Sequence, residues 1–286
     1  MNRRLAIRYA MLLFSAFLVL FPVYWILMTS IQPPTEWLKT PPVWLTTKPT
    51  TLNYGMILGI DFGAQGGTEA AYSVSKTAIQ PFINSLIIAI SATVLSMVLG
   101  TLTAWSISRF RVGGNQFALN MIAPRMFPPI AVALPLLIMY TNLDLLDSHI
   151  GLIIVYTGFT IPFSVWMTKS FIDDTPVELE EAAMVDGLTR FQTFYKITLP
   201  LIQPGIAATS LFIFILNWSD FLIAQTLTQS MDTAPTYLSK LFAPSQGQLL
   251  GPQAAHAVIA IVPVILLGYL IYDDLARGFT FGAIHK

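Results

Sequence analysis

Residues 178–200 read ELEEAAMVDGLTRFQTFYKITLP and lie between two long apolar stretches of the chain. Just before them, Asp174 and Pro176 offer an N-cap residue and a proline for a helix start. The acidic residues that follow suit the positive end of a helix dipole, and the alanines are good helix formers. Gly187 can adopt a left-handed backbone and end this helix. A second helix near 189–198 is expected to stop before the closing proline, which predicts a helix-turn-helix with a small-residue surface for docking.

The composition of the chain is that of a membrane protein. Of its 286 residues, 55% are hydrophobic and 10% are charged, and the mean hydropathy is +0.66, whereas soluble proteins carry about 25% charged residues. The net charge of zero gives no reason to expect nucleic acid as a partner. The absence of cysteine excludes thiolate metal sites, cysteine nucleophiles and disulfides. The three histidines are far apart in the sequence, so a histidine metal site is not expected.

Intervals without charged residues locate the membrane spans, because a spanning helix needs about 20 mostly apolar residues. They predict an all-α membrane protein with six transmembrane helices in a single domain, residues 1–286. The apolar run at the N-terminus lacks a small-residue cleavage site, so an uncleaved helix is expected. Prolines in the third and sixth spans predict kinks or breaks. The six spans are expected near 9–30, 82–106, 117–141, 149–168, 205–225 and 255–276.

Lysine and arginine residues orient the spans, because cytoplasmic loops carry an excess of them. With the N-terminus inside, ten fall in cytoplasmic segments and four in external segments. Both termini are therefore expected in the cytoplasm. Two long external loops, near 31–81 and 226–254, are rich in proline and glycine, and the long cytoplasmic loop is 169–204.

The spacing of residues around Gly187 resembles the cytoplasmic coupling loop of ABC importer permeases. The motif is Glu-Ala-Ala, three residues, glycine, nine residues, isoleucine, one residue and Leu-Pro. The resemblance implies the type I ABC importer permease fold, in which this loop inserts a short helix into a cleft of the ATP-hydrolysing subunit. The residues assigned to ATPase coupling on this basis are Glu181, Ala182, Ala183, Asp186, Gly187, Ile197, Leu199 and Pro200.

Other segments resemble the carbohydrate-uptake branch of these importers, of the type found in maltose, trehalose and glycerol-phosphate uptake. The resemblance implies half of a translocation pathway for a carbohydrate or polyol in the bacterial inner membrane. It also implies a second homologous permease subunit, two ATP-binding subunits and an external solute-binding protein. The segments are Gln32 to Tyr54, Phe82-Ile83-Asn84-Ser85, Arg125-Met126-Phe127-Pro128-Pro129 and Asn217-Trp218-Ser219-Asp220-Phe221.

The chain lacks the G-x-x-x-x-G-K-[ST] loop that cradles nucleotide phosphates. No cofactor is therefore expected in this chain, and ATP and Mg would be bound by the partner ATPase subunits. The chain is expected to be a transport subunit and not an enzyme.

Polar residues at membrane depth are candidates for the solute pathway, because burying them in lipid is costly. Arg125, early in the third span, lines the pathway, pairs with a carboxylate, or extends to the inner interface. Asp220, with Asn217 and Trp218 in the fifth span, offers an acceptor and an aromatic face, as sugars require. The alternative for these three residues is hydrogen bonding between helices.

Two other functional classes compete with the importer subunit. A secondary transporter or channel would work without an ATPase, and a membrane-embedded enzyme would need a pair of catalytic groups that Asp220 alone does not supply. Within the importer class, amino acids or peptides are the alternative solutes.

Overall fold

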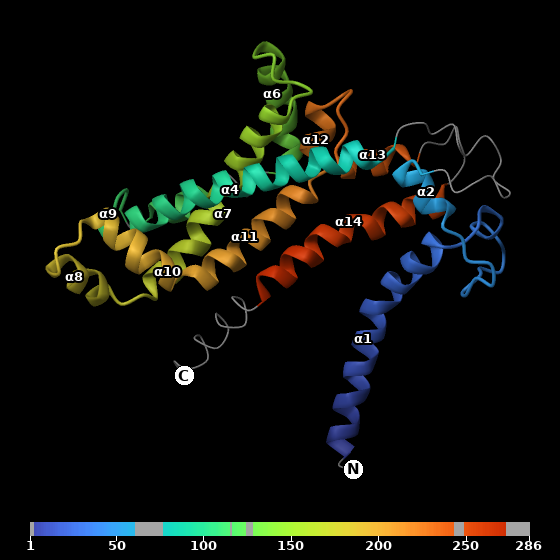
Figure 1. The fold of residues 1–286 in the computed structure, drawn as a ribbon, viewed down its shortest axis with the longest axis horizontal. Coiled ribbons are helices and arrows are strands. Elements are labelled where there is room, and N and C mark those ends of the chain that lie inside the picture. Colours follow the sequence, from blue (N-terminus) through green and yellow to red (C-terminus); the bar gives the residue numbers. More distant parts are fainter. Residues whose placement is uncertain (1–2, 61–76, 115, 124–127, 243–248, 273–286) are drawn as a thin grey trace. The chain divides into compact units, whose positions relative to one another are not determined.

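The computed structural model describes residues 3–60, 77–114, 116–123, 128–242 and 249–272 (Figure 1). These residues form helices and connecting segments without any strand, which confirms the predicted all-α class. The chain divides into two compact units, residues 1–82 with 234–262 and residues 83–233 with 263–286. Helices α4 (Ile79–Phe110) and α14 (Leu250–Leu270) each contribute to both units.

The first unit holds α1 (Arg3–Ser30), the 3-10 turn η1 (Pro34–Glu36), α2 (Leu52–Leu58), α13 (Ala234–Lys240) and the start of α14. Asn53 in α2 donates from Nδ2 to the carbonyl oxygens of Ser30 and Gln32, both at 2.9 Å, and so satisfies orphan carbonyls at the end of α1. The ring of His256 stacks between those of Phe82 and Tyr237. They border the apolar core of this unit, which is formed by Ile57, Ala78, Tyr237, Leu241, Leu249 and Ala255.

Helix α1 is apolar on all sides and packs against almost nothing in the described residues. Its segment Ile7–Ser30 is long enough to cross a membrane, and none of its most apolar window is buried. A helix that is hydrophobic all round needs an apolar environment outside its own chain.

The second unit holds the rest of α4 with α5 (Phe117–Ile122), α6 (Pro129–Asn142), α7 (His149–Asp173), α8 (Val177–Val185), α9 (Arg190–Thr193), the π-turn η3 (Phe194–Thr198), α10 (Leu199–Leu201), α11 (Gln203–Trp218) and α12 (Leu222–Leu227). Helices α4 and α7 run parallel, because Asn84 contacts His149 at their beginnings and Arg109 contacts Ile172 at their ends. One apolar cluster lies near each end of this helix pair.

Small residues let α4 and α7 approach closely. At Gly100 there is no room for a methyl group against Ser164, and the hydroxyls of Ser96 and Thr160 are hydrogen-bonded at 2.6 Å. Close contacts of small and hydroxyl-bearing residues are typical of helices packed within a membrane.

Four of the helices in the described residues are long and apolar enough to cross a membrane, and a fifth candidate is the bent pair of Arg190–Leu201 and Gln203–Trp218. The first, second, fourth and sixth predicted spans correspond to α1, α4, α7 and α14. The third prediction, 117–141, is divided between α5 and α6, in a region that contains Pro128 and Pro129. The fifth prediction, 205–225, was wrong as one continuous helix, because α11 ends at Trp218 and α12 begins at Leu222.

Asp147, in the loop between α6 and α7, forms hydrogen bonds with the segment that follows α12. Its Oδ1 accepts hydrogen bonds from the backbone N–H groups of Gln229, Ser230 and Met231 at 2.6, 2.9 and 3.1 Å. Partial burial raises the pKa of this carboxyl, but the backbone donors outweigh it, so the pKa of Asp147 lies below its ordinary value of 3.8. The folded chain therefore stabilises the ionised form of Asp147 more than the unfolded chain does.

Asp147→Asn is expected to lower the free energy of unfolding by about 1 kcal/mol at neutral pH, because the bond is charge-assisted but partly exposed. A carboxyl whose pKa is lowered by folding stabilises the fold at pH values above its pKa in the unfolded chain. This contribution is lost as the pH falls through its pKa in the folded chain. The parental chain should therefore lose stability as the pH falls below 3.8, and the variant should lose less. Thermal unfolding in detergent at several pH values measures this, with Asp144→Asn, which shares the φ of +52° and the loop, as the control. Equal acid sensitivity of both variants and the parent would contradict the prediction.

Candidate functional site

The predicted coupling stretch forms two helical pieces at the end of the second unit where α4 and α7 finish (Figure 1). Gly187 has a φ of +92°, so its predicted role at the end of the first helix is confirmed. Its N–H donates to the carbonyl of Met184, and that of Leu188 donates to Ala183, both at 3.1 Å. This is the Schellman pattern, which closes the end of α8 on a glycine.

Two local predictions for this stretch were wrong. Asp174 does not cap α8: its N–H donates to the carbonyl of Ser170 at 3.1 Å and ends α7, and Pro176 occupies the N-cap position. The second helix also does not stop before Pro200 but continues to Leu201. A π-turn makes this possible, because the N–H of Leu199 bonds to the carbonyl of Phe194, five residues back.

The outer surface of the stretch is more apolar than the small-residue surface that was predicted. Ala182 is exposed as expected, but Ala183 is buried. The exposed face adds Val185, Phe191 and Tyr195, which are 87%, 65% and 65% exposed. Exposed apolar side chains of this size, close together in a short stretch, are typical of a surface that another protein covers.

A buried ion pair lies behind this surface. Arg109 Nε is 2.8 Å from Glu180 Oε1, and the two side chains are only 8% and 7% exposed. Arg109 Nη2 donates to the carbonyl oxygens of Ile172 and Thr175, both at 3.0 Å. Glu180 Oε1 also accepts from the hydroxyl of Thr198 at 2.9 Å. The pair thus joins α4, the end of α7, α8 and η3.

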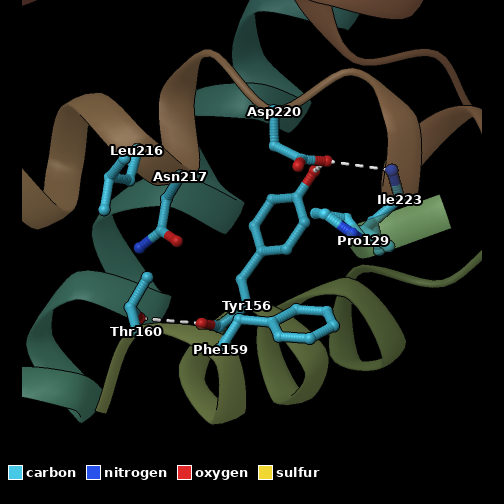
Figure 2. A pocket seen from close by; sticks show the side chains of 8 residues that line it. All are labelled: Pro129, Tyr156, Phe159, Thr160, Leu216, Asn217, Asp220 and Ile223. Carbon is cyan, nitrogen blue, oxygen red and sulfur yellow. Dashed lines mark hydrogen bonds between the residues drawn. The ribbon is translucent and has the colours of Figure 1, made fainter. Parts of the chain in front are cut away.

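A pocket of about 110 Å³, lined by both polar and apolar side chains, lies between α6, α7, α11 and α12 (Figure 2). Tyr156 lies seven residues after the start of α7, which places the pocket about 10 Å along that helix. The pocket is therefore nearer the end of the unit opposite the coupling stretch. Its lining residues are Pro129, Tyr156, Phe159, Thr160, Leu216, Asn217, Asp220 and Ile223.

Asp220 lies in the break between α11 and α12, not within a helix as predicted. Its Oδ1 accepts from the hydroxyl of Tyr156 at 3.0 Å and from the N–H groups of Ile223 and Ala224 at 3.1 and 3.4 Å (Figure 2). An aspartate that bonds to the backbone ahead of it favours the start of a helix over its interior. This preference explains why the predicted fifth span is interrupted here.

The other pathway candidates occupy different positions. Asn217 lines the pocket, and its Nδ2 donates to the hydroxyl of Thr93 in α4 at 3.3 Å. Trp218 is buried and stacks on Phe214, with ring centroids 5.7 Å apart. Arg125 lies outside the described residues.

The amino-acid sequence between residues 96 and 280 matches the family described as the inner membrane component of binding-protein-dependent transport systems. This match covers more than half of the chain. The chain belongs to this family. The resemblance to importer permeases predicted from the coupling motif is thereby confirmed, and the protein is an inner-membrane permease with several apolar helices. The predicted carbohydrate-uptake branch is supported by the sugar permeases to which the chain is similar.

Relatives and one solved structure agree with this assignment. The permease is 30% identical to the trehalose transport system permease protein of Mycobacterium tuberculosis, over 93% of this chain and 92% of that protein. It is 31% identical to a diacetylchitobiose uptake system permease protein of Streptomyces coelicolor, over 97% of this chain and 87% of that protein. Because such relatives are named as permease proteins, the chain is a transport subunit and not an enzyme, as predicted.

The fold of the permease matches a chain in the crystal structure of a bacterial ABC transporter involved in the import of the acidic polysaccharide alginate. The TM-score is 0.72 at 21% identity, over 96% of this chain and 97% of that chain. This likeness shows the fold.

Sequence reasoning missed Tyr156 and Phe159 in the pocket and the pairing of Arg109 with Glu180. The two aromatic residues lie in an apolar span, where nothing in the local sequence distinguishes them from lipid-facing neighbours. Arg109 was counted only among the basic residues that predict the orientation of the spans. An arginine in the last turn of a helix is also a candidate partner for a nearby carboxylate.

Proposed function

We propose that this chain is one of two membrane-spanning subunits of an ATP-driven importer and forms half of the pathway for a carbohydrate or polyol. Its membership of the binding-protein-dependent transport family carries the proposal. The solute class is supported by relatives named for trehalose, diacetylchitobiose and galactooligosaccharides. A second homologous permease, two ATP-binding subunits and an external solute-binding protein complete the importer.

Coupling to the ATPase occurs through α8 and the turn that follows it. The exposed face with Val185, Phe191 and Tyr195 inserts into a cleft of the ATP-binding subunit, and the Schellman end at Gly187 holds the face in shape. ATP and Mg are held by that subunit, and this chain carries no cofactor. The coupling residues are those assigned from the motif, Glu181, Ala182, Ala183, Asp186, Gly187, Ile197, Leu199 and Pro200.

The solute passes the pocket between α6, α7, α11 and α12. Asn217 and Asp220 offer amide and carboxylate groups to hydroxyls, and Phe159 and Tyr156 offer the apolar faces that sugar rings require. Trp218 contributes indirectly, because its stacking on Phe214 fixes the end of α11. Arg125 remains a predicted pathway residue.

Six spans in one permease domain carry this pathway, with both termini in the cytoplasm. The parallel course of α4 and α7 supports this topology, because it requires one span between them that returns, as α5 and α6 together would provide. The apolar surface of α1 is covered by lipid or by the second permease.

Copurification tests the central claim. A tagged chain expressed with its neighbouring genes should retain an ATPase subunit, and the reconstituted complex should take up a sugar from a panel of trehalose, diacetylchitobiose and galactooligosaccharides only when ATP is inside. Uptake by the chain alone, without ATP, would instead identify a secondary transporter or channel.

Cysteine labelling tests the topology, and the chain contains no cysteine of its own. A cysteine in place of Thr47, which is exposed in the loop after α1, should react with an impermeant thiol reagent added to intact cells. A cysteine in place of Val185 should react only after the cells are opened. The opposite pattern would reverse the orientation, and reaction at both sites in intact cells would contradict the span assignment.

A further inference from the structure

Helix α8 has little fully buried apolar surface with which to hold itself against the spans. Of its nine residues only Glu180 and Ala183 are buried. The hydrophobic effect scales with buried apolar area, and α8 adds to the alanine only the partly covered Leu179 and Met184, which are 46% and 41% exposed. The position of α8 therefore depends on the hydrogen bonds and the ion pair of Glu180.

The partner of Glu180 is held in place from several directions. Arg109 belongs to the last turn of α4, and its Nη2 donates to the carbonyl oxygen of Ile172 in the last turn of α7 and to that of Thr175 just beyond it. Because a guanidinium is planar and rigid, these bonds fix the direction in which Nε meets Glu180. α4, α7 and α8 are thus locked in one arrangement by a single side chain.

The carboxylate of Glu180 also contacts the segment that leads into α11. Thr198, which is completely buried in the π-turn, donates its hydroxyl to Glu180 Oε1. Four residues later the chain bends by 75° into α11, the helix that carries Asn217 to the pocket. A displacement of α8 is therefore passed to α4, α7 and α11 together.

We propose that the Arg109–Glu180 pair is the joint through which movement of α8 reaches the spans, and that Arg109 and Glu180 are positioning residues for transport. The inference rests on the proposed docking of α8 to the ATPase but concerns the opposite, buried face of that helix. If either partner is neutralised, the other charge is left buried without compensation. Because α8 has little else to hold it, it moves away from the spans and restores solvation to that charge, while the spans stay folded.

The test uses the full complex of both permeases and the ATPase, with a single reporter cysteine in place of Ser219. This residue is exposed beside Asp220 and is not among the pocket lining. The reaction rate of the reporter with a thiol reagent is measured before and after trapping with ATP and vanadate. In the parental complex the rate should change on trapping. In Glu180→Gln and Arg109→Gln complexes that change should shrink by about tenfold, while ATP hydrolysis continues, because the charge that locks α8 is gone.

Lys169→Gln is the matched control, because it removes an ion pair with Asp173 that is more exposed and lies within one helix at the same end of the unit. It should behave like the parent. A parental response in both Glu180→Gln and Arg109→Gln would overturn the inference, as would an equal loss in the Lys169→Gln control.

Two further measurements keep the inference falsifiable. If the charge variants do not assemble, Arg109→Lys decides, because it keeps the charge but not the planar group that bonds Glu180, Ile172 and Thr175 together: a reduced response supports the joint and a parental response overturns it. A cysteine in place of Val185 should cross-link to the ATPase subunit in the parental complex. Failure of that cross-link would refute the proposed docking itself, whereas a successful cross-link with a parental response in the variants would refute only the joint.

Discussion

Replacing Gly187 by valine is expected to uncouple uptake from ATP hydrolysis. The φ of +92° at this position is one that a β-branched residue adopts only with strain. A penalty of about 1–3 kcal/mol for such a conformation corresponds to an approximately 5- to 150-fold loss of the correctly formed turn. Because the Schellman bonds of Gly187 and Leu188 close α8, the helix end and the exposed Val185 would lose their shape.

The measurement is uptake and stimulated ATP hydrolysis in proteoliposomes that contain the whole importer. A Cβ at Gly187 meets nothing within 4 Å, so the substitution acts through the backbone and not through a clash. Gly187→Asn should retain most of the activity, because asparagine tolerates a left-handed backbone. Gly114→Val is the matched control, since Gly114 also has a positive φ, +74°, and open space around it but lies in the loop after α4. Uncoupling by both valine variants, or by neither, would contradict a specific role for Gly187.

The span pattern and the end of α8 could be predicted because each depends on local chemistry. Long apolar intervals need a membrane or a core whatever surrounds them, and they located α1, α4, α7 and α14 with ends that differ from the observed ones by up to six residues. A glycine after a run of good helix formers ends a helix for reasons of backbone geometry alone, and Gly187 does so.

The break in the predicted fifth span and the buried ion pair depend on contacts between residues that are distant in sequence. Asp220 breaks the fifth span because the hydroxyl of Tyr156, 64 residues away, and the amides of the next helix satisfy its carboxylate. Arg109 and Glu180 are 71 residues apart and meet only because α4 and α7 end side by side. Local propensity carries no information about such pairs, so the long apolar intervals identified the spans but not the sites between them.

The N-cap of α8 was misplaced for a similar reason. Asp174 and Pro176 have the residue types of a helix start, but α7 runs on to Asp173 because its last turn is stabilised by Arg109 from another helix. The side chain of Arg109 donates to the carbonyl oxygen of Thr175, just beyond the helix, and to that of Ile172, which also accepts from the N–H of Thr175. The tertiary contact thus overrides the local signal.

The pocket offers the second large effect, a loss of uptake in Asp220→Asn. Asparagine keeps an oxygen that can accept from Tyr156, Ile223 and Ala224, so the break between α11 and α12 and the assembly of the complex should be preserved. It loses the negative charge, however, and hydrogen bonds to charged groups are worth roughly 1–1.5 kcal/mol more than neutral ones. Uptake of the transported sugar should therefore fall by about tenfold.

Tyr156→Phe separates the two possible roles of this carboxylate. If Asp220 contacts the solute, removing the tyrosine hydroxyl frees an acceptor position on Oδ1 and should change the preference among sugars while the complex still assembles. If Asp220 only packs helices, Tyr156→Phe should lower thermal stability without changing that preference, and Asp220→Asn should transport at the parental rate. Ser219→Ala is the control, because its hydroxyl bonds to the carbonyl of Ile215 within α11 and it is not among the pocket lining. Parental uptake of every tested sugar by assembled Asp220→Asn and Tyr156→Phe complexes would exclude this pocket from the pathway and assign the binding site to the partner permease.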